Sequence, residues 1–281
     1  MIARLSFATL LLVSVAVAAC RPAPQPQAAP DQSVEAALRI SGSGAALPLV
    51  DKLAQEYSRQ HPSARFAIDA GTNSGGGIQG VVQGTLDLAV ANRPLTDAEG
   101  QQTLEVRPFA RDAVVFAAHP DHPVPGLSTA DVRQVYGGSI TDWAQIGGSP
   151  APVLVLDRDP DEPQRSLFLL KLLNGQSPEA RTTVLTSARD MLQTLEATSD
   201  SLGYSTLALL RIRQPKDVRV LALDGVTPGR QSLTAGTYPW YLTYTLINRP
   251  DAPRAVSRFL EFVRGPEGQR VLEQYDAAPA A

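Results

Sequence analysis

The chain has 281 residues, of which 43% are hydrophobic and 19% are charged, and its formal net charge is −3. A charge this mild excludes an extended nucleic-acid surface, which needs a clear excess of Lys and Arg. The single cysteine excludes a disulfide bond within one molecule, and beyond the N-terminus no apolar stretch is long enough to span a bilayer.

The N-terminal residues predict export and a membrane anchor. Arg4 is followed by an uncharged, mostly apolar run over residues 5–19, and small residues precede Cys20. This is the pattern of a secretory signal at residues 1–19, and its ending resembles the bacterial lipobox, in which the signal is cut and the new N-terminal cysteine is acylated. An ordinary cleaved signal with an incidental cysteine is the alternative. Prolines make residues 20–37 an extended tether, so we expect a lipid on Cys20 to hold the protein on a cell-envelope membrane.

From Ile40 onward, short apolar runs alternate with amphipathic segments, which is typical of a parallel sheet flanked by helices. Thr96 and Glu99 have the spacing of a capping box, and Gly265 ends a helix before Pro266 begins another. Strands are predicted at residues 65–70, 86–91, 113–118, 153–156 and 241–247, and helices at residues 48–60, 128–136, 166–173 and 252–264, with further helices beginning near Ile78 and after Thr96. These elements predict an α/β fold without internal repeats.

Two glycine-rich loops follow predicted strands and lead into helices. The first spans residues 42–46 and the second residues 72–77. Unpaired N–H groups and the helix dipole favour an anion at such a helix N-terminus, and glycine lets a ligand approach the main chain. Glycines that only permit tight turns are the alternative for each loop taken alone. Because open α/β sheets bind ligands at the carboxyl ends of their strands, the two loops together favour a ligand site.

Three arginines lie close to the ends of predicted strands. Arg93 and Arg158 follow strands directly, and Arg165 lies near the start of the next helix. A guanidinium group can bind an oxyanion through paired hydrogen bonds. The alternative is that each arginine pairs with a carboxylate. Acids are plentiful around Arg158 and Arg165, whereas the immediate neighbourhood of Arg93 contains none.

Metal and hydrolytic chemistry have weaker support. His119 and His122 are separated by two residues, but a proline breaks the segment and a solvated turn explains it better. Ser74 lacks the hydrolase motif G-x-S-x-G because Thr72 replaces its first glycine, and the carboxylates form no recognisable catalytic pair. We therefore expect a binding protein without a metal, a cofactor or enzymatic activity; a hydrolase that uses Ser74 as nucleophile is the remaining enzymatic alternative.

Several segments, taken in order, resemble the phosphate-binding proteins that serve phosphate-specific ABC importers. Residues 40–48 resemble the first ligand loop of that family, residues 73–78 its serine-glycine loop, and residues 84–95 its next strand and turn. Further matches follow in the same order: Ile140-Thr141-Asp142-Trp143, Gly203-Tyr204, Gly236-Thr237-Tyr238-Pro239 and residues 262–269. The resemblance covers nearly all of residues 40–272.

The resemblance implies a two-lobed periplasmic-binding-protein-like fold of type II, with mostly parallel sheets flanked by helices and lobes joined by crossing strands. Lobe 1 would comprise residues 38–117 and 206–281, and lobe 2 the inserted residues 118–205. The lobes would close around a dehydrated anion, which is a population shift that an importer can recognise. The candidate ligand-binding residues are then Gly44, Ala45, Ala46, Leu47, Ser74, Gly75, Gly76, Asn92, Arg93, Arg158 and Arg165.

Three positions depart from the phosphate-specific pattern. Ala46 stands where the family has a threonine hydroxyl, which leaves Leu47 only its main-chain N–H to offer, and Asn92 stands where the family has an aspartate that accepts a proton-bearing oxygen of phosphate. An amide can also donate, so Asn92 would tolerate a fully ionised oxyanion. Residues 161–164 replace the family's serine-glycine-threonine cradle with a segment that contains two acids and a proline. These departures argue against tight selectivity for phosphate.

The resemblance thus implies a monomeric lipoprotein, facing the periplasm, that captures phosphate or a related oxyanion for an ABC permease and its ATPase. It implies no nucleic-acid partner and contact with the membrane only through the lipid. The altered positions Ala46, Asn92 and Glu162-Pro163 favour the alternative of a sensor or envelope interaction module on the same scaffold, with weakened or altered anion binding.

Overall fold

The computed structural model describes residues 36–69, 72–122, 124–160, 162, 165–178 and 181–280, all of which belong to one unit, Val34–Ala281. The predicted signal, Cys20 and most of the predicted tether lie outside the described residues. Among the helices of the described residues, none is both long and apolar enough to cross a membrane.

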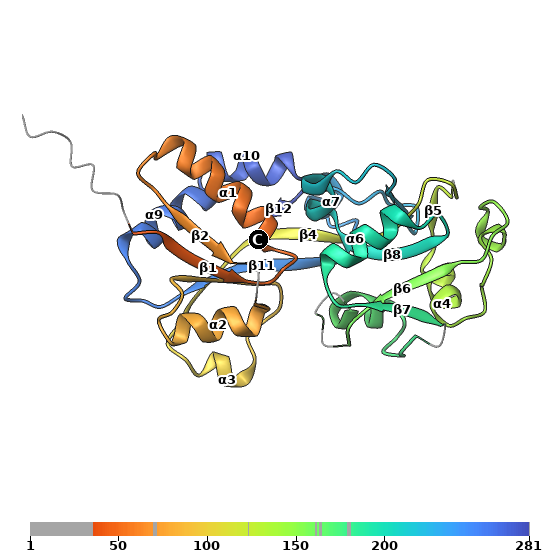
Figure 1. Ribbon diagram of the computed structural model, residues 1–281, viewed down its shortest axis with the longest axis horizontal. Coiled ribbons are helices and arrows are strands. Elements are labelled where there is room, and N and C mark those ends of the chain that lie inside the picture. Colours follow the sequence, from red (N-terminus) through yellow and green to blue (C-terminus); the bar gives the residue numbers. More distant parts are fainter. Residues whose placement is uncertain are drawn as a thin grey trace, which may run out of the picture. The chain divides into compact units, whose positions relative to one another are not determined.

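The main sheet is one path of hydrogen-bonded strands in the order β2-β1-β3-β11-β4-β8-β6-β7 (Figure 1). Its strands are β1 (Leu38–Gly42), β2 (Phe66–Asp69), β3 (Leu88–Ala91), β4 (Glu105–Ala118), β6 (Leu154–Arg158), β7 (Thr182–Leu185), β8 (Ser201–Thr206) and β11 (Tyr241–Asn248). β1 is parallel to β2 and β3, and β6 is parallel to β7 and β8. The predicted α/β class, with parallel strands on each side, is confirmed.

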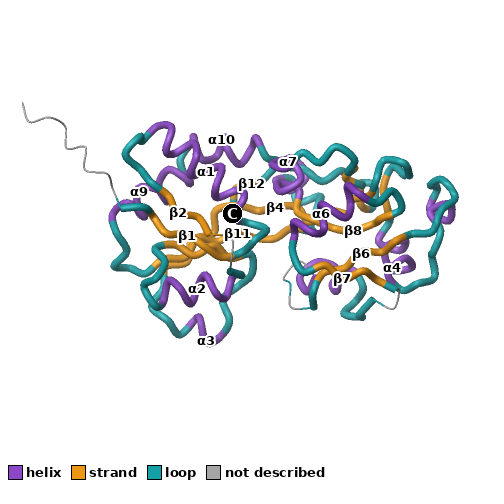
Figure 2. Tube along the Cα trace, viewed as in Figure 1, coloured by secondary structure: helices purple, strands orange, loops and turns teal. Residues whose placement is uncertain are grey.

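β4 is the strand that joins the two sets of parallel strands. Its residues up to Ala113 pair antiparallel with β11, and its residues from Val114 pair antiparallel with β8 (Figure 2). β12 (Ala278–Pro279) and β9 (Arg219–Val220) also pair with β4, whereas β5 (Gly126–Leu127) pairs with β10 (Ala222–Leu223). The predicted crossing strand is therefore confirmed, and the lobe boundaries at residues 117/118 and 205/206 stay a prediction.

Helices cover both faces of the β1–β3 strands. The longer helices of the described residues, including those that lie elsewhere in the molecule, are α1 (Leu47–Gln60), α2 (Ser74–Val82), α4 (Thr129–Tyr136), α6 (Ala188–Ala197), α9 (Arg254–Arg264) and α10 (Pro266–Gln274). The shorter ones are α3 (Asp97–Gly100), α5 (Leu170–Leu172), α7 (Leu207–Arg213) and α8 (Arg230–Thr234), together with the 3₁₀ turn Trp143–Ile146 and the π-helical turn Arg165–Leu169. Figure 1 shows α1, α9 and α10 on one face of β1–β3 and α2 and α3 on the other.

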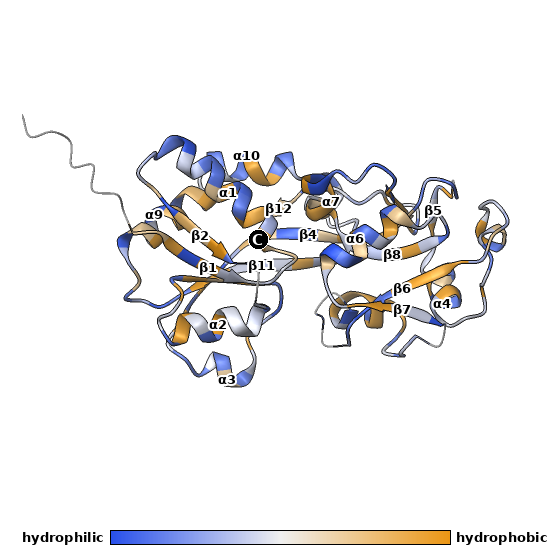
Figure 3. Cartoon of the chain, in the orientation of Figure 1, coloured by the Kyte–Doolittle hydropathy of each residue, from blue (hydrophilic) through white to orange (hydrophobic). Residues whose placement is uncertain are grey.

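The core follows the alternation of side chains along the strands. On β3, Leu88 and Val90 pack into the large core that α1 shares, whereas Ala89 and Ala91 pack with Ile78 and the rest of the α2 face. Successive residues of a strand point to opposite faces, so β3 needs apolar residues at every position. In Figure 3, β6 is likewise mainly hydrophobic, whereas α1 and α10 carry both hydrophilic and hydrophobic residues.

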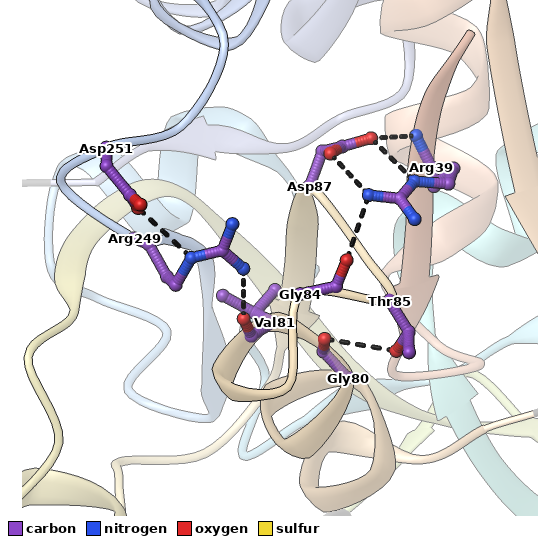
Figure 4. A network of polar contacts seen from close by, with 8 residues as sticks. All are labelled: Arg39, Gly80, Val81, Gly84, Thr85, Asp87, Arg249 and Asp251. Carbon is purple, nitrogen blue, oxygen red and sulfur yellow. Dashed lines mark hydrogen bonds and ion pairs between the residues drawn. The ribbon is translucent and has the colours of Figure 1, made fainter.

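Two arginines hold the C-terminal end of α2. Arg249 donates through Nη1 to the carbonyl oxygen of Val81 (2.6 Å), and Arg39 donates to the carbonyl oxygen of Gly84 (3.1 Å) while it pairs with Asp87 (2.8 Å) (Figure 4). Cations near a helix C-terminus complement the helix dipole. The first turn of α2 contains no acid, so its N-terminal end keeps the positive part of that dipole for other partners.

Candidate functional site

The loop before α1 carries four of the predicted ligand-binding residues. Leu47 begins α1, and the N–H groups of Ala46 and Leu47 donate to the carbonyl oxygen of Ser43 (3.1 and 2.9 Å). Among the described residues, the N–H groups of Gly44 and Ala45 have no main-chain acceptor. The available main-chain donors of this loop are therefore those of Gly44 and Ala45, not those of Ala46 and Leu47.

The loop before α2 places a serine hydroxyl against an amide. Ser74 Oγ donates to Asn92 Oδ1 (3.0 Å), and both side chains are buried, at 4% and 3% exposure. Asn73 is the N-cap of α2, and its Oδ1 accepts from the N–H of Gly76 (2.9 Å). The predicted helix is confirmed, but it begins at Ser74, inside the predicted loop. Ser74 and Asn92, which are 18 residues apart in the chain, lie side by side. A nucleophilic serine needs a base to take its proton, and an amide oxygen is not one, so this geometry gives the hydrolase alternative no support.

Glycine permits a close approach between α2 and β1. A Cβ added to Gly77 would lie 2.8 Å from the Cα of Gly42, and Gly42 itself has φ +142° and would place a Cβ 2.1 Å from Val90 O. Both glycines therefore allow α2 to pack closely against β1. Gly44 differs, because nothing lies within 4 Å of its added Cβ.

Arg93 pairs with a carboxylate, and the expectation that its neighbourhood contains no acid is wrong. Its Nη1 and Nη2 each lie 2.8 Å from one oxygen of Glu99, which is also the capping-box residue of α3. The Arg93 guanidinium lowers the pKa of the Glu99 carboxyl to about 2. A Cβ on Gly75 would lie 3.3 Å from Arg93 Nη2, so the pair lies next to the first turn of α2. Glu99 is six residues along the chain from Arg93, and the turn that leads into α3 places its carboxylate next to the Arg93 guanidinium.

Arg158, the last residue of β6, is buried with only part of its hydrogen-bonding capacity used. Its residue exposure is 2%. Nη2 lies 2.8 Å from Glu162 Oε1 and makes a long contact of 3.5 Å to Thr186 O. Nε and Nη1 are buried and have no hydrogen-bond partner among the described residues. An unsatisfied buried donor costs about 1–3 kcal/mol, and more when it is charged.

Arg165 pairs with a carboxylate, which is the alternative that the sequence left open for the three arginines. Its Nε pairs with Asp157 Oδ2 (2.9 Å), and Asp157 Oδ1 accepts from the Tyr204 hydroxyl (2.8 Å) and from the N–H of Arg158 (2.8 Å). Burial and then nearby groups, Tyr136 and Asp157, raise the pKa of Tyr204, so its phenol keeps the proton that it donates. These bonds fix the end of β6. The sequence reasoning gave Asp157 no such role, and it found Tyr204 only as part of a resembling dipeptide.

A cavity of about 970 Å³ lies between the N-terminal ends of α1 and α6. From the α1 side it is lined by Gly44, Leu47 and Pro48, and from the α6 side by Ser187 and Asp190. Thr186, whose carbonyl oxygen contacts Arg158, directly precedes Ser187. The cavity thus receives main-chain groups from the predicted first ligand loop and from the segment next to Arg158.

The structure brings the predicted residues together in groups. Ser74 contacts Asn92, Arg93 lies beside Gly75, and Gly44 and Leu47 line the cavity; Arg158 contacts the segment that leads into α6. Ser41, which the sequence reasoning did not single out, joins this region because its hydroxyl shares a 2.6 Å bond with Thr72. Ser41 lies in the segment 40–48 and Thr72 in the loop 72–77, and their hydroxyl groups were the only feature of the sequence that could have indicated a role.

The histidines have other partners. His122 Nε2 lies 3.0 Å from Asp200 Oδ1, and its ring stacks on Trp143 at 4.9 Å. His119 Nδ1 lies 3.3 Å from Asp121. Within the described residues, no group of three or more His, Cys, Asp or Glu side chains is placed to hold a metal ion.

Two sets of parallel strands, each flanked by helices and joined through the crossing strand β4, define the periplasmic-binding-protein fold of type II. The chain belongs to the family described as the PBP superfamily domain, whose model matches residues 25–267. The predicted fold class and the predicted kind of family are confirmed.

Named relatives agree with this membership. The phosphate-binding protein PstS of Borreliella burgdorferi is 23% identical over 252 residues, which cover 87% of this chain and 90% of that protein. PstS of Bacillus subtilis is 25% identical over 244 residues, covering 86% and 80%. A solved structure of a putative phosphate ABC transporter substrate-binding protein with bound phosphate, from Clostridium perfringens, has a TM-score of 0.77 at 20% identity and covers 88% of this chain and 100% of that chain.

Proposed function

We propose that this protein is an extracytoplasmic solute-binding protein that captures inorganic phosphate or a related tetrahedral oxyanion and presents it to an ABC importer. The observation that carries the proposal is Arg158: its guanidinium is buried, and its Nε and Nη1 have no partner among the described residues. Each edge of a guanidinium with two parallel N–H donors includes Nη2, which Glu162 holds here, so an oxyanion would take a single bond from Nε or Nη1, or a paired set once Nη2 leaves Glu162. The names of the relatives given above point to the same class of ligand.

The cavity approaches this group, because it is lined by Ser187, which follows Thr186, whose carbonyl oxygen contacts Arg158. Its lining includes the starts of α1 and α6, and neither the first turn of α1 nor the loop before it contains an acid. The positive end of the α1 dipole favours an anion there, whereas Asp190 in the first turn of α6 and Asp51 of α1 oppose one. Glu162 opposes the anion, because its carboxylate already occupies Nη2 of Arg158. An anion that takes a single bond from Nε or Nη1 would share the guanidinium with Glu162, which favours moderate over very tight binding.

The proposed residues divide by the group that they contribute. Arg158 supplies charged donors, Gly44 and Ala45 supply N–H groups, and Ser74 with Asn92 supplies a hydroxyl and an amide. A second group is proposed to shape and support the site, because its members make hydrogen bonds or ion pairs within the protein or lie beside such bonds: Ala46, Leu47, Gly75, Gly76, Arg93 and Arg165.

Calorimetry against phosphate, sulfate, molybdate and arsenate at one fixed salt concentration tests this proposal. We expect heat from at least one oxyanion with 1:1 stoichiometry, and we expect the Arg158→Ala variant to lose most of that affinity. No binding to any of the four by a folded protein would remove the proposal. Lobe closure, which the division at residues 117/118 and 205/206 requires, is expected as a decrease in radius of gyration with the bound anion.

Attachment to the membrane is proposed from the sequence, because Cys20 lies outside the described residues. Replacing Cys20 by Ala should release the exported protein from the membrane fraction of the producing cell, and mass spectrometry of the wild-type N-terminus should find an acylated cysteine. The proposed protein is a monomer that faces the periplasm and is not an enzyme.

A sensor or envelope interaction module is the second candidate, and the Arg158–Glu162 ion pair favours it. Glu162 competes with the anion for Arg158 and so lowers the affinity for the anion. A transporter needs a high affinity more than a sensor does. Neighbouring permease and ATPase genes would favour import, whereas a neighbouring kinase or secretion cluster would favour sensing.

A further inference from the structure

A fully buried carboxyl group lies where β4 passes from one set of strands to the other. Asp112 is 0% exposed and pairs with Leu242 of β11, and two residues later Val114 pairs with Thr206 of β8. Asp112 Oδ1 accepts from the N–H of Ala208 in the first turn of α7 (2.9 Å). The carboxyl group therefore ties the crossing strand to the start of a helix.

The second carboxylate oxygen leads to the loop before α1. Tyr244 of β11 donates from its hydroxyl to Asp112 Oδ2 at 2.8 Å, and the same hydroxyl lies 3.4 Å from the carbonyl oxygen of Ala45. A phenol has one proton, so it can satisfy only one of the two acceptors fully. The bond to a charged carboxylate is the stronger one. Burial, and then the charge of Asp112, raises the pKa of Tyr244 well above its usual value, so the phenol keeps this proton.

The carboxyl group itself can change state under ordinary conditions. Burial raises the pKa of Asp112 to about 6, against the opposing effect of the bonds from Ala208, Tyr244 and the Thr206 side chain. Among the described residues, Asp276 is the charged group that acts on Asp112; it favours the neutral form and is itself paired with Arg211. Arg111, next to it on β4, donates elsewhere, to Pro279 O, and no described cation pairs with Asp112.

We propose that Asp112 is a proton-responsive positioning residue for the loop before α1. When Asp112 is charged, it holds the hydroxyl proton of Tyr244, and the contact of Tyr244 with Ala45 stays long. When Asp112 takes up a proton from solvent, it donates that proton to Tyr244 Oη, and the phenol turns its own proton to the carbonyl oxygen of Ala45. The loop is therefore held more firmly at low pH.

This inference rests on the proposed function at one point only, namely that the loop belongs to the ligand site. In that case protonation of Asp112 on the crossing strand β4 also changes the affinity for the anion. The positioning of the loop by Asp112 and Tyr244 stands without any ligand, so it can be tested without one.

Two variants separate the states. Asp112→Asn imitates the neutral carboxyl, because its Oδ1 can accept from Ala208 and its Nδ2 can donate to Tyr244. Tyr244→Phe removes the hydroxyl that links Asp112 to Ala45. Neither replacement changes side-chain size greatly, and thermal unfolding of each variant checks that it folds.

Hydrogen exchange measured by mass spectrometry on the ligand-free protein provides the readout. Peptides covering residues 43–50 are compared at pH 5.0 and 7.5, with labelling times scaled for the intrinsic exchange rates and with the α2 peptide, residues 74–82, as internal control. We expect the wild-type loop to be about two- to tenfold better protected at the lower pH, the range of one net hydrogen bond. Asp112→Asn should show the high protection at both values, and Tyr244→Phe the low protection at both.

Inorganic phosphate gives a second readout. The affinity ratio of Asp112→Asn to wild type should be about two- to tenfold at pH 7.5 and about one at pH 5.0, and the titration of phosphate itself cancels in this ratio. A wild-type loop whose scaled protection does not depend on pH, or a pH dependence that persists in Tyr244→Phe, would overturn the inference. If neither phosphate nor sulfate, molybdate or arsenate binds but the exchange pattern holds, the proposed function fails and this inference stands. Should Asp112→Asn not fold, the wild type and Tyr244→Phe still decide the question.

Discussion

Arg93 and Arg158 occupy comparable places in the chain, since each lies at the end of a parallel strand, yet the structure gives them different surroundings. Both Nη atoms of Arg93 are bound by Glu99. Arg158 has one Nη atom on Glu162 and two nitrogens without a partner among the described residues. An arginine at a strand end is therefore not yet an anion site. What decides its role is how many of its donors the protein itself already uses.

The carboxylates that pair with these two arginines are also expected to have different roles. Glu99 belongs to a capping box and so contributes to the structure of α3 as well as to the ion pair. Glu162 has a side-chain exposure of 31% and caps no described helix. We expect Glu99 to matter for stability and Glu162 to matter for ligand affinity.

Replacement of Arg158 by Ala is expected to have the largest effect. The variant loses the charged donors proposed to bind the ligand, so anion affinity should fall by about 1.5–3 kcal/mol, the range for hydrogen bonds to a charged group. Calorimetry with the oxyanion that binds the wild type measures this change. Arg165→Ala is the matched control, because its Nε pairs with Asp157. Equal losses in both variants would show that the end of β6 matters as a whole and would remove the special role of Arg158.

The next effect is on stability at low pH. The pKa of Glu99 is lowered to about 2 by Arg93, so the ion pair contributes stability above the unfolded-state value near 4.5. That contribution is lost as the pH falls from 4.5 through 2. Because the pair is partly exposed, we expect it to be worth only about 1 kcal/mol. The difference in unfolding free energy between wild type and Glu99→Gln, measured by urea denaturation, should shrink over this range, and a constant difference would contradict the assignment.

How far these features could be predicted depends on whether the signal is local. The capping boxes at Thr96–Glu99 and Ser128–Asp131 are formed within four residues, and both predicted helix starts are confirmed. β4 is longer than predicted: it begins at Glu105, and it contains Pro108, which a strand rarely tolerates. The register shift between Tyr244 and Thr245 places Pro108 next to a bulge in the β11 ladder, where it fits. Pro108 is tolerated because the pairing with β11 is irregular at that point. The sequence of β4 alone does not reveal how it pairs with β11.

Contacts between distant residues account for most of what the sequence reasoning missed in the site. Asp157 binds Tyr204 across 47 residues, and Asp112 binds Tyr244 across 132. Neither spacing has a periodic signature. The contact between Ser74 and Asn92 was anticipated only as far as the family resemblance placed both in ligand loops. The predicted helix at residues 166–173 also begins with a π-helical turn, which its apolar spacing did not indicate.

Replacement of Glu162 by Gln should increase anion affinity. It removes one negative charge beside the proposed ligand and weakens the hold on Nη2 of Arg158, because a neutral amide oxygen replaces a carboxylate oxygen. Because the carboxylate is partly exposed, the gain should be about 0.3–1 kcal/mol, which is roughly two- to fivefold in affinity. Asp159→Asn is a control for general charge near the same loop. A loss of affinity in Glu162→Gln would mean that Glu162 orients Arg158 for the ligand, and the two carboxylates would then not differ as proposed.

The smallest expected effect on affinity belongs to Arg93→Ala. If Glu99 uses both Nη atoms of Arg93, removing the guanidinium should change anion affinity less than about twofold, because the anion loses only a distant and compensated charge. The same variant should lose about 1 kcal/mol of stability, since Glu99 is left without its partner. Calorimetry and urea denaturation on one preparation measure both quantities. A loss of affinity as large as that of Arg158→Ala would mean that Arg93 leaves Glu99 when the anion binds, and the two arginines would then act as one pair of clamps from opposite sets of strands.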